Sequence, residues 1–169
     1  MAYDLSDVST FACWTRLNET PEEIAHMTMT FMEEFSSRVA VGRWTSLDDD
    51  WDRTEEDLVR VIEKYVIRDS DNEPSPEEGY HFSLPGLDGP LRTTISVAAG
   101  GSELSERVAS PSFSQDFFWS AQATAGDVWD ASVHAAVMAF DPAFVVGQEM
   151  SVLMLDRRGG WTLPTGYRV

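Results

Sequence analysis

The chain of 169 residues is poor in cysteine and has no long apolar run. A single cysteine, Cys13, excludes an internal disulfide and any zinc site built from several cysteines. No segment approaches the roughly 20 apolar residues that a membrane-spanning helix needs. The first residues also lack the basic region and apolar stretch of a signal peptide. We therefore expect a protein that neither spans a membrane nor is secreted, and we place it in the cytoplasm.

Positive charge is scarce as well, with 12 basic against 29 acidic side chains and a net charge of −17. Binding to DNA or RNA needs cations that neutralise phosphates, so this balance argues against direct nucleic-acid binding and against docking on an anionic membrane. The acidity favours either a basic partner or simple solubility. Because 43% of residues are hydrophobic and 11% aromatic, the chain can form a core and is not a disordered acidic tail.

Three segments carry helix signals. Thr20, Pro21 and Glu23 form a capping box with proline at the first helical position, and apolar residues follow at helical spacing, which predicts a helix over 21–39. Thr54 caps a second helix, whose acidic first turn suits the helix dipole. Thr124 starts a third helix, predicted to end at 140 before Asp141-Pro142.

The remaining periodic segments read as strands. Alternating or β-branched patterns predict strands at 10–17, 80–84, 91–99 and 113–121, and a closing hairpin at 152–156 and 160–163. Few connections repeat the strand-helix-strand form of a parallel sheet. We therefore predict an α+β fold, a mostly antiparallel sheet with about three helices packed on it, as a single domain over 1–169. Trp14 and Trp119 lie in predicted strands and are expected in the core.

Catalytic motifs are not found in the sequence. It has no HExxH, no GxSxG and no phosphate-binding glycine loop. Of the three histidines, His26 and His134 fall in predicted helices without a second metal ligand at suitable spacing. Cys13 is interpreted as a buried or half-buried thiol, since nothing near it suggests activation. We predict no catalytic residue, no metal and no cofactor; a small metal-dependent hydrolase using His81 or His134 with carboxylates stays open as an alternative.

The most informative segment runs from Asp48 to Asp57 and holds seven acids and one base around Trp51. Calcium-binding loops have ligands at alternating positions and a glycine at the bend. In this segment the acids are consecutive and there is no glycine, which argues against calcium binding. It is either a solvated loop leading into a helix, or a binding surface with an aromatic anchor ringed by carboxylates. Trp44 and Trp51 are expected to be partly exposed. The candidate protein-binding residues are Trp44, Asp48, Asp49, Asp50, Trp51, Asp52, Glu55 and Glu56.

Several short motifs, taken in order, resemble a known family. They are Phe11-Ala12-Cys13-Trp14-Thr15-Arg16, the capped segment Thr20-Pro21-Glu22-Glu23-Ile24-Ala25, Arg43-Trp44, Asp141-Pro142 and Gly160-Trp161. Together they resemble the immunity protein 52 family of bacterial polymorphic toxin systems, most strongly over the first quarter of the chain. The resemblance implies a small cytoplasmic α+β protein that binds and neutralises a cognate toxin, often one with a restriction-endonuclease-like nuclease fold.

The charge and the resemblance agree on one kind of partner. A nuclease has a basic cleft for phosphates, and an acidic face can occupy such a cleft and exclude nucleic acid. The leading hypothesis is a stoichiometric, non-catalytic inhibitor of a basic toxin, a nuclease. Besides the hydrolase, a second alternative is a phage-type acidic decoy or adaptor that binds another basic protein.

Overall fold

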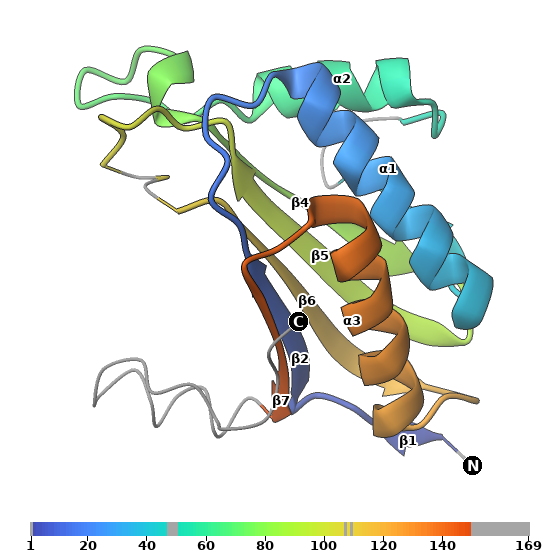
Figure 1. The fold of residues 1–169 in the computed structure, drawn as a ribbon. Coiled ribbons are helices and arrows are strands. Elements are labelled where there is room, and N and C mark those ends of the chain that lie inside the picture. The colour runs from blue at the N-terminus through green and yellow to red at the C-terminus, as the bar shows by residue number, and fades with distance from the viewer. Residues whose placement is uncertain (1, 47–50, 107, 109, 150–169) are drawn as a thin grey trace.

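In the described part of the chain, one antiparallel sheet carries three helices on one of its faces (Figure 1). The computed structural model describes residues 2–46, 51–106, 108 and 110–149. In these, the strand order is β3-β4-β5-β6-β2-β7, and β1 pairs with β6 beside β2. The predicted α+β class is confirmed. The strands are β1 (Tyr3–Asp4), β2 (Val8–Cys13), β3 (Arg43–Trp44), β4 (Tyr80–Leu87), β5 (Leu91–Ala99), β6 (Ser112–Ser120) and β7 (Phe144–Glu149).

The helices begin where the capping signals place them. They are α1 (Pro21–Arg38), α2 (Glu55–Lys64) and α3 (Ala125–Phe140), with a short 3₁₀ turn at Pro76–Glu78. Thr20 and Thr124 each accept a hydrogen bond from the backbone three residues on, within full capping boxes. At the start of α2, the Thr54 side chain accepts a hydrogen bond from the backbone N–H of Asp57. All three predicted helices are therefore confirmed, since their starts are fixed by local chemistry.

The strands agree with the sequence less completely. β5 spans the predicted residues, whereas the strand predicted at 10–17 runs from Val8 to Cys13. β4 continues beyond the prediction to Leu87, through Pro85, and β1, β3 and β7 were not predicted. The predicted hairpin at 152–156 and 160–163 lies outside the described residues.

The core lies between the helices and the sheet, with α1 in contact with both α2 and α3 (Figure 1). Phe31 of α1 packs on Phe113 of β6 with ring centroids 4.3 Å apart, and Phe140 of α3 packs on Phe113 at 5.0 Å. All three rings are buried. Each buried aromatic side chain stabilises the fold by about 1.5–3 kcal/mol, so this cluster ties α1 and α3 to the sheet.

In its middle strands, the opposite face of the sheet carries small polar side chains. Ser83, Ser96 and Ser114 lie opposite one another on β4, β5 and β6, and the hydroxyl oxygens of Ser83 and Ser96 are 2.7 Å apart. The described helices all lie on the other face. The prediction that Trp119 belongs to the core is wrong: a register shift between β5 and β6 interrupts the alternation, and Trp119 is 38% exposed.

Candidate protein-binding site

The described part of the acidic segment lies at the start of α2. Asp52, Glu55 and Glu56 are exposed there, and Trp51 is half-buried against the hydrophobic core. The other predicted members, Asp48, Asp49 and Asp50, lie outside the described residues. The structure thus brings an aromatic side chain and three solvent-facing carboxylates together within six residues of chain.

Hydrogen bonds around the cap of α2 hold this segment in place. The Asp57 carboxylate accepts from the backbone N–H of Asp52 at 2.8 Å, and the Thr54 hydroxyl donates to the Asp52 carboxylate at 3.1 Å. The Thr54 hydroxyl oxygen in turn accepts from the backbone N–H of Asp57 at 3.1 Å. Asp52 and Thr54 are therefore fixed relative to the helix. The indole N–H of Trp51 also donates a hydrogen bond to the Thr54 carbonyl oxygen, at 3.3 Å.

Asp57 has a structural role that sets it apart from its acidic neighbours. Its side chain is buried and forms an ion pair with Arg60 one turn along α2. The hydrogen bond from the Asp52 backbone, aided by the charge of Arg60, lowers the pKa of the Asp57 carboxyl, although burial opposes the shift. Asp57 is therefore ionised at neutral pH and committed to the cap.

Trp44 is part of the core, so the expectation that it is partly exposed is wrong. It is 8% exposed, its ring packs edge-on to Phe35 with centroids 6.4 Å apart, and its indole N–H donates to the Ser36 hydroxyl at 3.2 Å. The two-residue strand β3 places Trp44 beside β4, and this pairing is a long-range contact that local sequence does not reveal. Trp44 thus contributes to the site as a buried side chain that packs against α1.

A hollow of about 580 Å³ lies between β3 and the start of α2. Only some of the predicted binding residues line this hollow. Trp44, Trp51 and Asp52 line it, whereas Glu55 and Glu56 do not. Two arginines also line it, Arg43 and Arg60, paired with Asp88 and Asp57 respectively. The hollow itself is therefore of mixed charge. Glu55 faces α1 instead, 3.2 Å from the imidazole of His26.

The three histidines lie apart. His26 joins α1 to Glu55 of α2, and His134 of α3 lies 3.5 Å from Glu34 of α1. His81 alternates along β4 with core residues and faces the side of the sheet away from the helices. His81 and His134 are consequently on opposite faces. Within the described residues no group of three His, Cys, Asp or Glu side chains could hold a metal ion.

Cys13 lies at the end of β2 and is half-buried. Burial raises the pKa of its thiol to about 11. The thiol is therefore neutral at physiological pH, the reverse of the lowered pKa that activates a nucleophilic cysteine.

Glu19 is a buried carboxylate that the sequence patterns do not single out. Its side chain is wholly buried, accepts the indole N–H of Trp14 at 2.5 Å and the backbone N–H of Gly100 at 3.0 Å, and lies 3.8 Å from the Arg16 guanidinium. The signal was the close spacing of Trp14, Arg16 and Glu19 just before the helix cap at Thr20.

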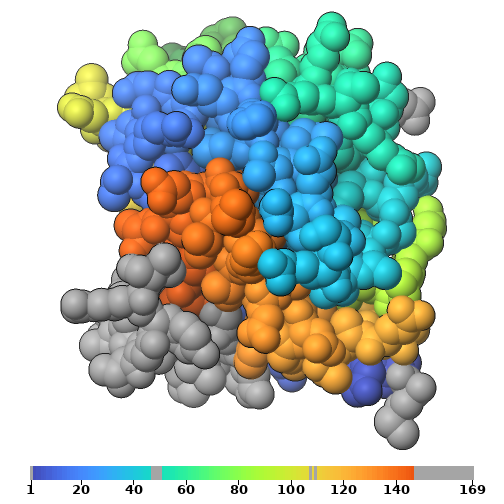
Figure 2. Space-filling model, turned by 45° about the vertical axis from the view of Figure 1, so that its right-hand side comes forward, coloured from blue at the N-terminus to red at the C-terminus, as the bar shows by residue number. Residues whose placement is uncertain are grey.

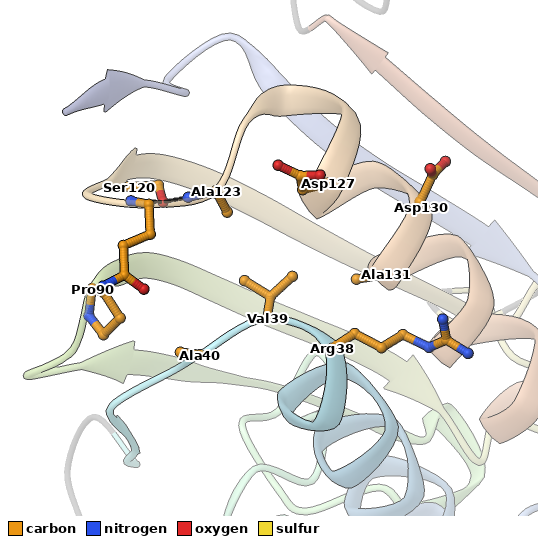
Figure 3. Close-up of a pocket in the computed structure, with 10 residues that line it drawn as sticks. Arg38, Val39, Ala40, Pro90, Ser120, Ala123, Asp127, Asp130 and Ala131 are labelled. Carbon is orange, nitrogen blue, oxygen red and sulfur yellow. Dashed lines mark hydrogen bonds between the residues drawn. The ribbon is translucent and has the colours of Figure 1, made fainter. Parts of the chain in front are cut away.

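A smaller hollow of about 350 Å³ lies where the end of α1 faces the start of α3 (Figure 3). Asp127 points into this region but is committed to the cap of α3, accepting from both the backbone and the hydroxyl of Thr124 at 2.8 Å. Ser120 accepts from the backbone of Ala123 at 2.8 Å. Among the described residues that line this hollow, none belongs to the predicted binding set.

No protein-family model matches the chain, and no curated protein matches it. Across the described residues, every helix is too short or too polar to cross a bilayer. What the fold defines is an α+β protein with a helical layer on one face of an antiparallel sheet, and an acidic, aromatic segment at the start of α2.

Proposed function

We propose that this protein is a non-catalytic immunity protein that binds a basic bacterial toxin, a nuclease, in the cytoplasm and neutralises it. The observation that carries the proposal is the fixed arrangement at the start of α2. Trp51 is held half-exposed by its bond to Thr54, and the exposed side chains of Asp52, Glu55 and Glu56 follow it in the chain within five residues. The net charge of −17 gives the whole molecule the sign that a basic partner attracts.

Charge and aromatic surface have separate roles in such an interface. Exposed carboxylates steer a basic partner and raise the association rate, while a central aromatic side chain supplies most of the binding free energy. Because the cap network already orders Asp52 and Thr54, little conformational entropy is lost on binding. Trp44 supports this face from the core, and Asp48, Asp49 and Asp50 belong to the proposed face by their place in the sequence.

The test uses the purified product of the gene immediately upstream. We expect a stable complex with it and inhibition of its nuclease activity that is complete at a one-to-one ratio. The triple change Asp52→Lys, Glu55→Lys and Glu56→Lys should weaken binding at least about tenfold, since each exposed charge pair contributes about 0.2–1 kcal/mol and reversal adds repulsion.

A matched control reverses three exposed acids elsewhere, Asp71→Lys, Glu73→Lys and Glu77→Lys. This variant has the same net charge as the first but keeps the face at α2 intact, so its affinity should fall much less. Equal losses in the two variants would reject the face at α2. Absence of a complex, or inhibition at far less than one equivalent, would reject a stoichiometric immunity protein.

A further inference from the structure

A hollow of about 570 Å³ lies between the start of α1 and the end of α3. Figure 2 shows the two segments side by side, with the blue surface of the chain entering α1 above the orange-red end of α3. Three buried apolar side chains line it, namely Trp14, Met27 and Phe140. The rings of Trp14 and Phe140 are stacked, with centroids 4.9 Å apart and planes at 11°. The hollow therefore has a rigid apolar floor.

Its rim is acidic. Glu22 and Glu23 reach it from the first turn of α1, and Asp141 reaches it from the end of α3; all three are exposed. Asp141 is the C-cap of α3, and the last turn of α3 holds no basic residue. Since the C-terminal end of a helix is itself negative, the Asp141 carboxylate and the helix dipole both favour a cation at this point.

The two basic side chains that line the hollow already have acidic partners. Arg16 lies beside the wholly buried Glu19, with 3.8 Å between Nε and Oε1, and its guanidinium touches the sulfur of Met27 at 3.1 Å. His26 lies beside Glu55. The carboxylates of Glu22, Glu23 and Asp141 therefore outnumber the one arginine that lines the hollow, and that arginine is already paired with Glu19.

We propose that this hollow receives one arginine side chain of the basic partner, a proposal that rests on the proposed function. The apolar stem of the arginine lies along Met27 and the stacked rings, and its guanidinium meets Glu22 and Asp141. Arginine suits this site because its guanidinium is weakly hydrated and pairs with carboxylates in a fixed geometry. The hollow is a second contact point, separate from the acidic segment at α2.

The experiment is an NMR titration of the full chain with N-acetyl-arginine amide, and with N-acetyl-citrulline amide as its neutral counterpart. The indole N–H of Trp14 and the backbone amides of Ala139 and Phe140 are the local reporters. We expect saturable shift changes at these reporters with the arginine probe only. The double change Glu22→Gln and Asp141→Asn should weaken binding about fivefold, from two exposed charge pairs of about 0.5 kcal/mol each.

Two further variants keep the result interpretable. Asp71→Asn with Glu73→Gln removes the same charge from an exposed loop and should leave the dissociation constant within about twofold. Ala139→Leu narrows the hollow without changing its charge. With this variant, the shift changes caused by the arginine probe should no longer saturate. The proposal is overturned if citrulline binds as well as arginine, or if the two charge variants weaken binding equally. Probe binding here without any toxin complex would reject only the proposed function, and a toxin complex without probe binding would reject only this hollow.

Discussion

The indole N–H of Trp14 donates a 2.5 Å hydrogen bond to the buried carboxylate of Glu19. Glu19 thereby joins two distant parts of the chain, because its second oxygen accepts from Gly100 after β5 and its first lies near Arg16. Burying a carboxylate is costly unless it is paired and hydrogen-bonded, and here it is both. Substitution of Glu19 should therefore show how much this one side chain contributes to the free energy of unfolding.

We expect Glu19→Ala to lower the free energy of unfolding by about 3–5 kcal/mol, because two buried N–H groups and a guanidinium lose their partner. Glu19→Gln should cost less, since its carbonyl oxygen still accepts one of the two bonds. Urea unfolding measures both, and the indole resonance of Trp14 reports the lost bond. The exposed Glu73→Ala should change stability by less than about 0.5 kcal/mol; an equally mild effect for Glu19→Ala would contradict the structure.

Alanine substitutions of Trp44 and Trp51 should differ in their effects: the first should mainly lower the free energy of unfolding, and the second should mainly weaken toxin binding. Trp44→Ala removes a buried ring and is expected to cost about 3–5 kcal/mol of stability. Trp51 is only half-buried, so Trp51→Ala should cost distinctly less in unfolding but at least about 2 kcal/mol in affinity for the toxin. Thermal unfolding and calorimetric titration give the two quantities. If Trp51→Ala leaves affinity unchanged, Trp51 is not the anchor of the interface.

Stability should fall in alkaline solution because of Cys13. In the unfolded chain the thiol ionises above its ordinary pKa of 9.0, whereas in the folded protein its pKa is about 11. Between these values the unfolded state binds fewer protons than the folded state, so stability decreases as pH rises. Urea unfolding from pH 8 to 11 should show a steeper decline for the native chain than for Cys13→Ala. Parallel curves would mean that the thiol is not buried as described.

Asp116 should weaken the fold at neutral pH. It lies on β6, opposite Ser9 and Thr94 in the neighbouring strands, and partial burial raises the pKa of its carboxyl above 3.8. The folded state then holds its proton to higher pH than the unfolded state, so stability is lost as pH rises through the folded pKa. Asp116→Asn should be more stable than the native chain at pH 7, and the difference should shrink at pH 3. A variant that is less stable at both pH values would count against this assignment.

The parts of the fold that the sequence predicts are those set by neighbouring residues. Thr20 with Glu23, and Thr124 with Asp127, fix two helix starts through bonds three residues apart, and the alternation of 91–99 reveals β5. The two-residue strand β3 exists only through its pairing with β4, so its own sequence carries no pattern. β7 is similarly defined by its partner β2.

In the candidate site, too, some features are visible in the local sequence and others depend on long-range packing. Its acidic and aromatic composition is visible in the sequence, and so is the cap at Thr54. The burial of Trp44, the commitment of Asp57 to the cap, and the turn of Glu55 towards His26 depend on how α1, α2 and β3 pack. Glu19 shows the limit most clearly, because one of its donors is Gly100, far along the chain.

The position of β2 in the sheet separates it in time from its partners while the chain is being made. β2 lies between β6 and β7, and its residue Cys13 pairs with Ser112 and Phe144. At about 5–20 residues per second, a ribosome needs roughly 5–20 seconds to make the intervening hundred residues. During that interval β2 has neither of its neighbours, and its unpaired edges are open to other chains. In a growing cell, β2 can therefore take its place in the sheet only after both β6 and β7 have been made.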